Sequence, residues 1–234
     1  MNSILKRFLY YLIGFTIGLI FVLFFFQNRG CAWLPSNRVK NTILDKVIIL
    51  PASENAIFKA EGFDKNTILS FLNDGDIIFN ESIKDQGVFP KVYIIENKVD
   101  NKTKRLQFTL YEDSYISPVH YLPAEESAKA YTSFEGMGSI LRLPRDSALL
   151  YIDQSNYVQC KAQKLNHKNK EKLTQELKTT GEIDFSKSDL MLPKAEHFIT
   201  FIHNDSIQVR AKTIWFESRI TFKDFFWEDS LNCK

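Results

Sequence analysis

Two histidines and an arginine near the end of the chain are the residues whose types and spacing could do chemistry. His197 and His203 lie six residues apart in an alternating segment, so a regular strand would carry both imidazoles on one face. Arg210 and Lys212 lie on the next segment of strand-like alternation. Imidazole and cationic groups that converge on a phosphate are what a ribonuclease needs. Chemistry on a phosphate group with His197, His203 and Arg210 as catalytic residues is therefore one hypothesis.

A half-buried strand explains the same residues without any reaction, and this is the interpretation that we favour. The segment from Ile207 to Trp215 alternates apolar and polar residues as an ordinary two-faced strand does. The histidines and carboxylates show no metal-ligand spacing, and no glycine loop of the phosphate-binding type is present. Three isolated cysteines fit neither a disulfide scaffold nor a zinc site; they are Cys31, Cys160 and Cys233. We expect no metal, no cofactor and no catalysis.

One short phrase occurs twice in the chain: Gly, an acidic residue, Ile, any residue, Phe, two further residues and Ser. Each copy follows a segment with leucines and isoleucines at helical spacing, and a glycine there is expected in the left-handed conformation of a helix stop. The Ile and Phe that follow alternate as a short strand would. We interpret the phrase as a structural repeat motif, made of Gly75, Phe79 and Ser82 in one copy and Gly181, Phe185 and Ser188 in the other.

The match extends on both sides of the phrase and predicts the domain organisation. Each copy reads as a strand, two helices and then three strands in a meander. The sequence predicts an α+β protein with two tandem domains of this kind. The first domain covers residues 35–116 and the second covers residues 145–234. A linker at 117–144, which contains Pro118, Pro123 and Pro144 and a short helix near 124–134, would join them.

Residues 1–34 form the predicted N-terminal membrane anchor. From Phe8 to Phe26 the chain has 19 consecutive residues without a charge, which at about 1.5 Å per residue crosses a hydrocarbon core of about 30 Å. A cleaved signal peptide is the rival, but its apolar core is shorter, about 7–15 residues, and ends in small residues. Gly14 and Gly18 have the spacing that lets two membrane helices approach closely, so a homodimer is a further alternative.

Charge distribution bears on partners and on orientation. The five basic residues within 1–40 are accompanied by no acidic residue, whereas the remainder of the chain is close to neutral. Positive charge is therefore not spread over the soluble part as in a nucleic-acid-binding protein, and we expect no nucleic acid as partner. The basic residues on the two sides of the span nearly balance. A short segment before a first span usually stays inside, which favours a periplasmic soluble part on a single-pass protein of the bacterial inner membrane.

Several of these features together are similar to a known family. A membrane segment, Cys31, the stretch from Pro35 to Lys40, the phrase from Gly75 to Ser82 and the stretch from Tyr93 to Glu96 resemble small bacterial membrane-anchored proteins of domain-of-unknown-function family 4258. The resemblance covers about residues 1–116, and a second copy is a departure from it. It implies a fold like that of the RelE/barnase-like group of small α+β nucleases and toxins, which is an analogy of fold and not of reaction. The alternative function that the resemblance implies is a membrane-tethered RNase- or toxin-like enzyme of that group, with His197, His203 and Arg210 as its candidate catalytic residues.

The aromatic residues at the end of the chain point to a partner. Alternation from Arg219 onward puts Ile220, Phe222 and Asp224 on one face, so the following Phe225, Phe226 and Trp227 do not all fit a small core. They either fold back on the protein or dock on a partner, and we take them as candidate partner-binding residues. The favoured hypothesis is an accessory or scaffolding subunit that binds the bilayer and a larger membrane protein assembly.

Overall fold

The computed structural model describes most of the chain. The described residues are 3–29, 34–85, 87, 89–112, 114–144, 150–152, 170–189, 192–216 and 219–227. Two compact units are present, Met1–Val39 and Lys40–Lys234, and each is considered by itself.

The first unit consists mainly of helix α1 (Ser3–Arg29), whose 27 residues extend for about 40 Å. Within it, the 18 residues from Lys6 to Leu23 are apolar enough to cross a membrane, and none of them is buried. Space for at least a methyl group exists around Gly14 and Gly18, since no other atom lies within 4 Å of a Cβ built there. The predicted apolar N-terminal helix is therefore present. Helix α2 (Pro35–Leu44) follows it.

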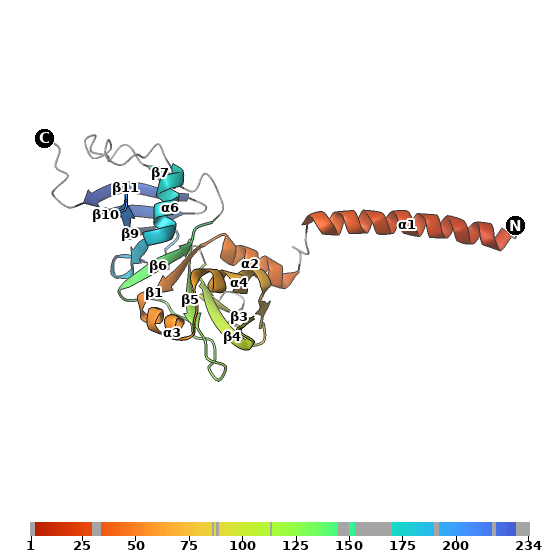
Figure 1. The fold of residues 1–234 in the computed structure, drawn as a ribbon, viewed down its shortest axis with the longest axis horizontal. Helices are drawn as coiled ribbons and strands as arrows, with labels where there is room; N and C mark the ends of the chain where they lie inside the picture. Colours follow the sequence, from red (N-terminus) through yellow and green to blue (C-terminus); the bar gives the residue numbers. More distant parts are fainter. Residues whose placement is uncertain are drawn as a thin grey trace. The chain divides into compact units, whose positions relative to one another are not determined.

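The second unit is an α+β structure built on one mixed sheet, as the sequence predicts for the fold class (Figure 1). Its first half contains β1 (Val47–Pro51), a 3₁₀ turn (Ala52–Glu54), α3 (Asn55–Ala60), α4 (Lys65–Asp74), β2 (Asp76–Ile77), β3 (Lys91–Val99), β4 (Lys102–Leu110) and β5 (Ile116–Tyr121). Its second half contains β6 (Met137–Arg142), β7 (Leu150–Ile152), α6 (Lys170–Thr180), β8 (Glu182–Asp184), a 3₁₀ turn (Phe185–Lys187), β9 (Ala195–His203), β10 (Ile207–Phe216) and β11 (Arg219–Trp227).

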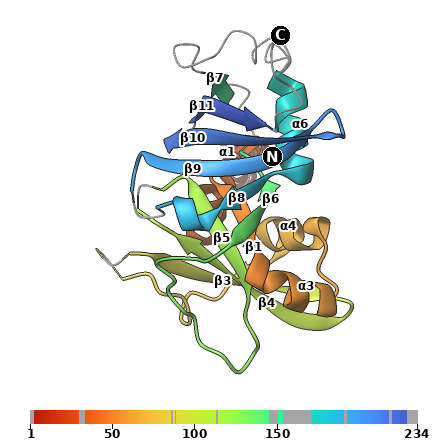
Figure 2. The same cartoon turned by 90° about the vertical axis from the view of Figure 1, so that its left-hand side faces the viewer.

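The strand order repeats itself across the eleven strands formed by the described residues, which run β2-β3-β4-β5-β1-β6-β8-β9-β10-β11-β7. In the first half β2 to β5 form an antiparallel meander, and β1 then pairs in parallel with β5. In the second half β8 to β11 form the same meander, and β7 pairs in parallel with β11. Strand β6 joins the halves, because it pairs antiparallel with both β1 and β8 (Figure 2).

The two central hairpins also turn in a similar way. Asp100 and Asn101 connect β3 to β4 with φ angles of 50° and 59°. Asn204, Asp205 and Ser206 connect β9 to β10, and the first two have φ angles of 51° and 58°. Asn and Asp tolerate this left-handed conformation better than other non-glycine residues, so the same turn chemistry appears at the same place in each half.

The repeated glycines serve a different purpose from the one predicted. Gly75 has φ −72° and ψ 164°, which is extended and not left-handed, so the expected left-handed helix stop is wrong there. A Cβ on Gly75 would lie 2.6 Å from the carbonyl oxygen of Phe71, and one on Gly181 would lie 2.3 Å from that of Leu177. Each glycine amide donates to that same oxygen at 3.0 Å. Glycine is thus required because the chain passes close to the last turn of the preceding helix.

The repeated serines make matching hydrogen bonds. Ser82 Oγ donates to the carbonyl oxygen of Ile78 at 2.7 Å, and Ser188 Oγ donates to that of Asp184 at 2.8 Å. Ser82 also accepts from the amide of Ile94 on β3 at 3.1 Å. The two serine hydroxyls therefore stabilise the turn that follows the short strand, as hydroxyl groups in turns commonly do.

The segment predicted as a linker, 117–144, differs from that expectation. It contains most of β5 and all of β6, and residues 124–134 are not helical. Residues Ile116 to His120 are buried on both faces of the sheet, which removes the alternation by which a strand is recognised. Both halves consequently belong to one sheet and one compact unit.

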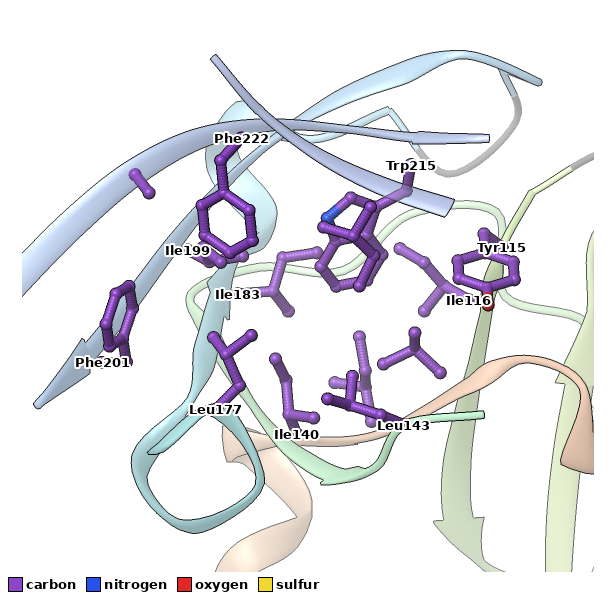
Figure 3. Close-up of a cluster of buried hydrophobic side chains, with 14 of the residues drawn as sticks. Tyr115, Ile116, Ile140, Leu143, Leu177, Ile183, Ile199, Phe201, Trp215 and Phe222 are labelled. Atoms are coloured by element: carbon purple, nitrogen blue, oxygen red, sulfur yellow. The ribbon is translucent and has the colours of Figure 1, made fainter. Parts of the chain in front are cut away.

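One apolar cluster extends across the two halves (Figure 3). From the first half it takes Val47, Ile49 and Ile116, and from β6 it takes Ile140. The second half supplies Leu173 and Leu177 from α6 and side chains from β8 to β11, with Trp215 and Phe222 almost fully buried. Burying such side chains contributes about 1.5–3 kcal/mol each, so this cluster holds the halves together.

Corresponding strands of the two halves run in opposite directions although their order is kept. The pairing of β6 with β1 and β8 imposes this reversal. When two copies of a strand array keep the same order but run in opposite directions, one copy is turned over relative to the other. The face that points to one side in the first copy then points to the other side in the second. Helix α4 of the first half and helix α6 of the second half therefore lie on opposite faces.

Candidate functional site

A long segment after β5 covers one face of the first half, and we call residues 122–136 the strap. Arg105 on β4 donates from Nη1 to the carbonyl oxygen of Ala124 at 2.7 Å. Gln107 donates to the carbonyl oxygen of Lys129 at 2.6 Å and accepts from its amide at 2.9 Å. Arg105 and Gln107 thus bind the strap by hydrogen bonds to its backbone. The strap buries the face of β4 on which these two side chains lie.

Aromatic contacts fix the far end of the strap. The ring of Tyr131 stacks on His120 of β5 at 4.5 Å between centroids, and that of Phe134 stacks at 5.3 Å. Tyr111 donates from its hydroxyl to the carbonyl oxygen of Tyr131 at 2.8 Å. Phe134 then reaches Phe185 of the second half at 5.1 Å. Burial lowers the pKa of His120 to about 4, so the ring is neutral at physiological pH.

The corresponding face of the second half has a pocket instead. We call the face that points away from α6 the outer face of the second half. Alternation along β9 separates Ile199 and Phe201, which enter the core beneath α6, from Phe198 and Thr200, which point outward. A pocket of about 220 Å³ opens there. It is lined by Asp184, Lys187, Phe198, Ile199, Thr200, Arg210 and Phe226.

Strand register shows which residues of the two faces correspond. Starting from the repeated phrase, the pairing runs Ile77–Ile95–Leu106 in the first half and Ile183–Ile199–Ala211 in the second. Arg105 and Arg210 immediately precede the last member of each series, so they occupy the same position. Within the phrase itself, Glu81 and Lys187 also occupy the same position.

The replacement of Glu81 by Lys187 at the corresponding position changes the charge next to the corresponding arginine. In the first half Arg105 is buried and forms an ion pair with Glu81. In the second half both Arg210 and Lys187 line the pocket. Lys187 pairs with Asp184 at 3.2 Å, whereas the guanidinium group of Arg210 has no hydrogen-bond or ion-pair partner within the described part of the chain. The described side chains that line the pocket therefore include two cationic groups and one carboxylate, that of Asp184.

The other two charged side chains that line the pocket, Asp184 and Lys187, are paired with each other. Asp184 accepts from the hydroxyl of Ser186 at 2.5 Å, and this bond, helped by Lys187, holds the pKa of the Asp184 carboxyl below its usual value. Lys212 pairs with Glu196 at 2.8 Å. The ammonium group of Lys187 also lies 5.6 Å from the ring centroid of Phe198, within cation–π range.

His197, His203 and Arg210 do not converge. The two histidines lie on one face of β9, as the spacing predicts, but that face points into the core, while Arg210 is exposed on the opposite face of the sheet. Along the strand, six residues separate the imidazoles by roughly 20 Å. No common phosphate position can touch all three groups, so the arrangement predicted for the nuclease hypothesis is not formed.

The surroundings of each histidine suit a structural role. His197 is fully buried beside Trp215 at 4.8 Å between centroids, and burial lowers its pKa to about 4 although Asp189 opposes the shift. His203 Nδ1 lies 2.9 Å from a carboxylate oxygen of Glu176 on α6. Neither imidazole reaches the pocket.

Phe225, Phe226 and Trp227 have different environments, which the sequence analysis did not separate. A β-bulge between Lys212 and Thr213 of β10 and their partners on β11 shifts the alternation by one residue. Phe225 is consequently buried and stacks on Phe222 at 5.2 Å, so Phe225 shares the face of Ile220 and Phe222. The prediction that Asp224 lies on that face is wrong. Phe226 is 42% exposed and lines the pocket. The side chain of Trp227 lies outside the described residues.

Of the residues that line the pocket, Arg210 and Phe226 were identified from the sequence and the others were missed. Only for Lys187 does the sequence contain a pattern that could have identified it. That pattern is the replacement of the first copy's Glu81 by a lysine inside an otherwise repeated phrase. The described residues contain no group of three or more His, Cys, Asp or Glu side chains that could hold a metal ion. No protein-family model matches the chain, and neither curated proteins nor solved structures give a significant match.

Proposed function

We propose that the protein is a membrane-anchored accessory or scaffolding subunit that binds a protein partner through the outer face of its second half. The observation that carries this proposal is the difference between two corresponding sheet faces. One is covered by the strap, and the other exposes Phe226 around a pocket together with Arg210, which has no partner among the described residues. An exposed apolar ring beside an unpaired guanidinium is a combination common at protein interfaces.

Two further parts of the proposal concern origin and location. The shared strand order and the matching serine contacts support a soluble part made of two copies of one unit. The apolar helix α1 supports an uncleaved single-pass anchor, with the soluble part on the periplasmic side of a bacterial inner membrane. A larger membrane protein assembly would then be the partner, reached by the soluble unit while α1 holds it near the bilayer.

Purification of the full chain in mild detergent, at native expression, tests this function. We expect a partner to co-purify in stoichiometric amount with the wild type and with Gln175→Ala, an exposed residue of α6 on the other side of the sheet. The double variant Arg210→Ala/Phe226→Ala should lose it. Absence of any stoichiometric partner, or retention of the partner by the double variant, would contradict the proposal. Ribonuclease activity of the purified chain that is lost in His197→Gln would instead favour the nuclease hypothesis.

A further inference from the structure

We propose that the outer face of the second half binds an extended acidic peptide segment of the partner, in the manner in which the strap covers the first half. This inference rests on the proposed function and specifies the chemistry of the partner. The strap shows the mode of binding within the same molecule, on a face that corresponds strand for strand.

The first half provides the geometric template. Its strap is neither helix nor strand, and the sheet holds it by hydrogen bonds to the backbone at Ala124 and Lys129. Arg105, which makes the first of these bonds, has its counterpart in Arg210. A guanidinium at this position, free of any partner among the described residues, is placed to donate to the backbone of a second extended segment.

Charge specifies the occupant further. Within the first half, Glu81 supplies the carboxylate for Arg105, and the strap does not need to. In the second half that position is Lys187, which lines the pocket together with Arg210. No carboxylate of the described residues takes the place of Glu81 beside Arg210, so the proposed segment carries Asp or Glu where it crosses Arg210. Arginine binds carboxylates in a bidentate manner, which favours an acidic side chain over a neutral one.

The size of the pocket favours a peptide over a small-molecule ligand. Its volume of about 220 Å³ is below the roughly 300–1,000 Å³ typical of sites for drug-sized ligands. A pocket of this size accepts one side chain. Phe198 and Phe226 form its apolar walls, so an apolar residue next to the acidic one would complete the contact.

The same face does not suit a nucleic acid. Asp184, Glu196 and Asp224 lie among its basic residues, on the outward side of β8, β9 and β11. Phosphate backbones bind surfaces on which lysine and arginine are clustered without acids. A face on which positive and negative side chains alternate fits a polypeptide that carries a few charged side chains of its own.

The strap itself provides a probe, because Glu125 and Glu126 follow Ala124 directly. A fluorescent peptide with the sequence of residues 122–136 would be titrated with the full chain in detergent, and its anisotropy measured. We expect saturable binding that Arg210→Glu weakens at least tenfold and that Gln175→Ala, an exposed change on α6, leaves unchanged. A peptide with lysine in place of Glu125 and Glu126 should bind the wild type at least tenfold more weakly and regain affinity for Arg210→Glu.

Several results would overturn the inference. These are the absence of saturable binding, equal binding by Arg210→Glu, and failure of the charge-reversed peptide to regain affinity.

A variant that ends at Trp227 controls for the chain's own last residues. Binding seen only in that variant would assign the face to residues 228–234 and not to a partner. If the peptide fails while a partner still co-purifies in an Arg210- and Phe226-dependent way, the mode of binding is wrong and the proposed function stands.

Discussion

Arg105 and Arg210 occupy the same position in the two halves of the sheet, but only Arg105 has a carboxylate partner among the described residues. Arg105 is 7% exposed and also holds the backbone of the strap. Arg210 is exposed beside a pocket. The same residue type therefore stabilises the fold in one half and is available for binding in the other.

Alanine substitutions at the two arginines should separate these roles. Arg105→Ala removes the bond to Ala124 and the ion pair with Glu81 from a covered site, and we expect a loss of about 2–4 kcal/mol in unfolding free energy. Arg210→Ala should stay within about 0.5 kcal/mol of wild type, since it is a surface change. Urea unfolding of the full chain in detergent, followed by tryptophan fluorescence, measures both. Equal losses would contradict the different roles assigned to them.

The adjacent residues Phe225 and Phe226 give a matched pair for the core and the surface. Phe225 is 7% exposed and stacks on Phe222, so Phe225→Ala should cost about 3 kcal/mol through the cavity it leaves. Phe226→Ala should change the unfolding free energy by less than about 1 kcal/mol while weakening partner binding. The unfolding free energy and the amount of co-purified partner, measured for both variants, test whether the β-bulge places Phe225 inside and Phe226 outside. Destabilisation by Phe226→Ala as large as that by Phe225→Ala would refute it.

Glycine at the two repeated positions is required by contact and not by a left-handed backbone. In Gly75→Ala the new Cβ would meet the carbonyl oxygens of Phe71 and Glu96 at 2.6 and 2.8 Å, and neither backbone atom can move cheaply. We expect a loss of about 1–3 kcal/mol from such overpacking. Asn73→Ala, an exposed change in the last turn of α4, is the control. A Gly75→Ala chain as stable as the control would show that the helix end adjusts easily.

Much of the fold could be predicted from the sequence because its signals are local. Helix-ending glycines, alternating strands and the apolar N-terminal helix follow from short-range patterns, and the α+β class follows from their order. Strand β5 could not be recognised, because Ile116 to His120 are buried on both faces and show no alternation. The burial of that strand depends on the strap and on β1, which are contacts across the fold. The β-bulge in β11 likewise depends on its pairing with β10.

The candidate site was only partly accessible to sequence reasoning for a related reason. His197 and His203 were predicted to share a face, and they do, but the sequence did not indicate which face α6 would cover. Arg210 was grouped with them although alternation on its own strand places it on the other side. The replacement of Glu81 by Lys187 becomes informative only when strand register shows that both positions lie next to corresponding arginines.

The two buried histidines should make the fold sensitive to acid. Burial lowers the pKa of His120 and of His197 to about 4, from about 6.5 when each is solvated. Between these values the unfolded chain binds protons that the folded chain does not, so stability is complete above pH 6.5 and falls as the pH drops towards 4. Each group can contribute up to about 3 kcal/mol to that fall. Urea midpoints between pH 7.5 and 4.5 measure the slope, which His120→Gln and His197→Gln should each reduce. A slope unchanged in both variants would show that other groups govern the acid response.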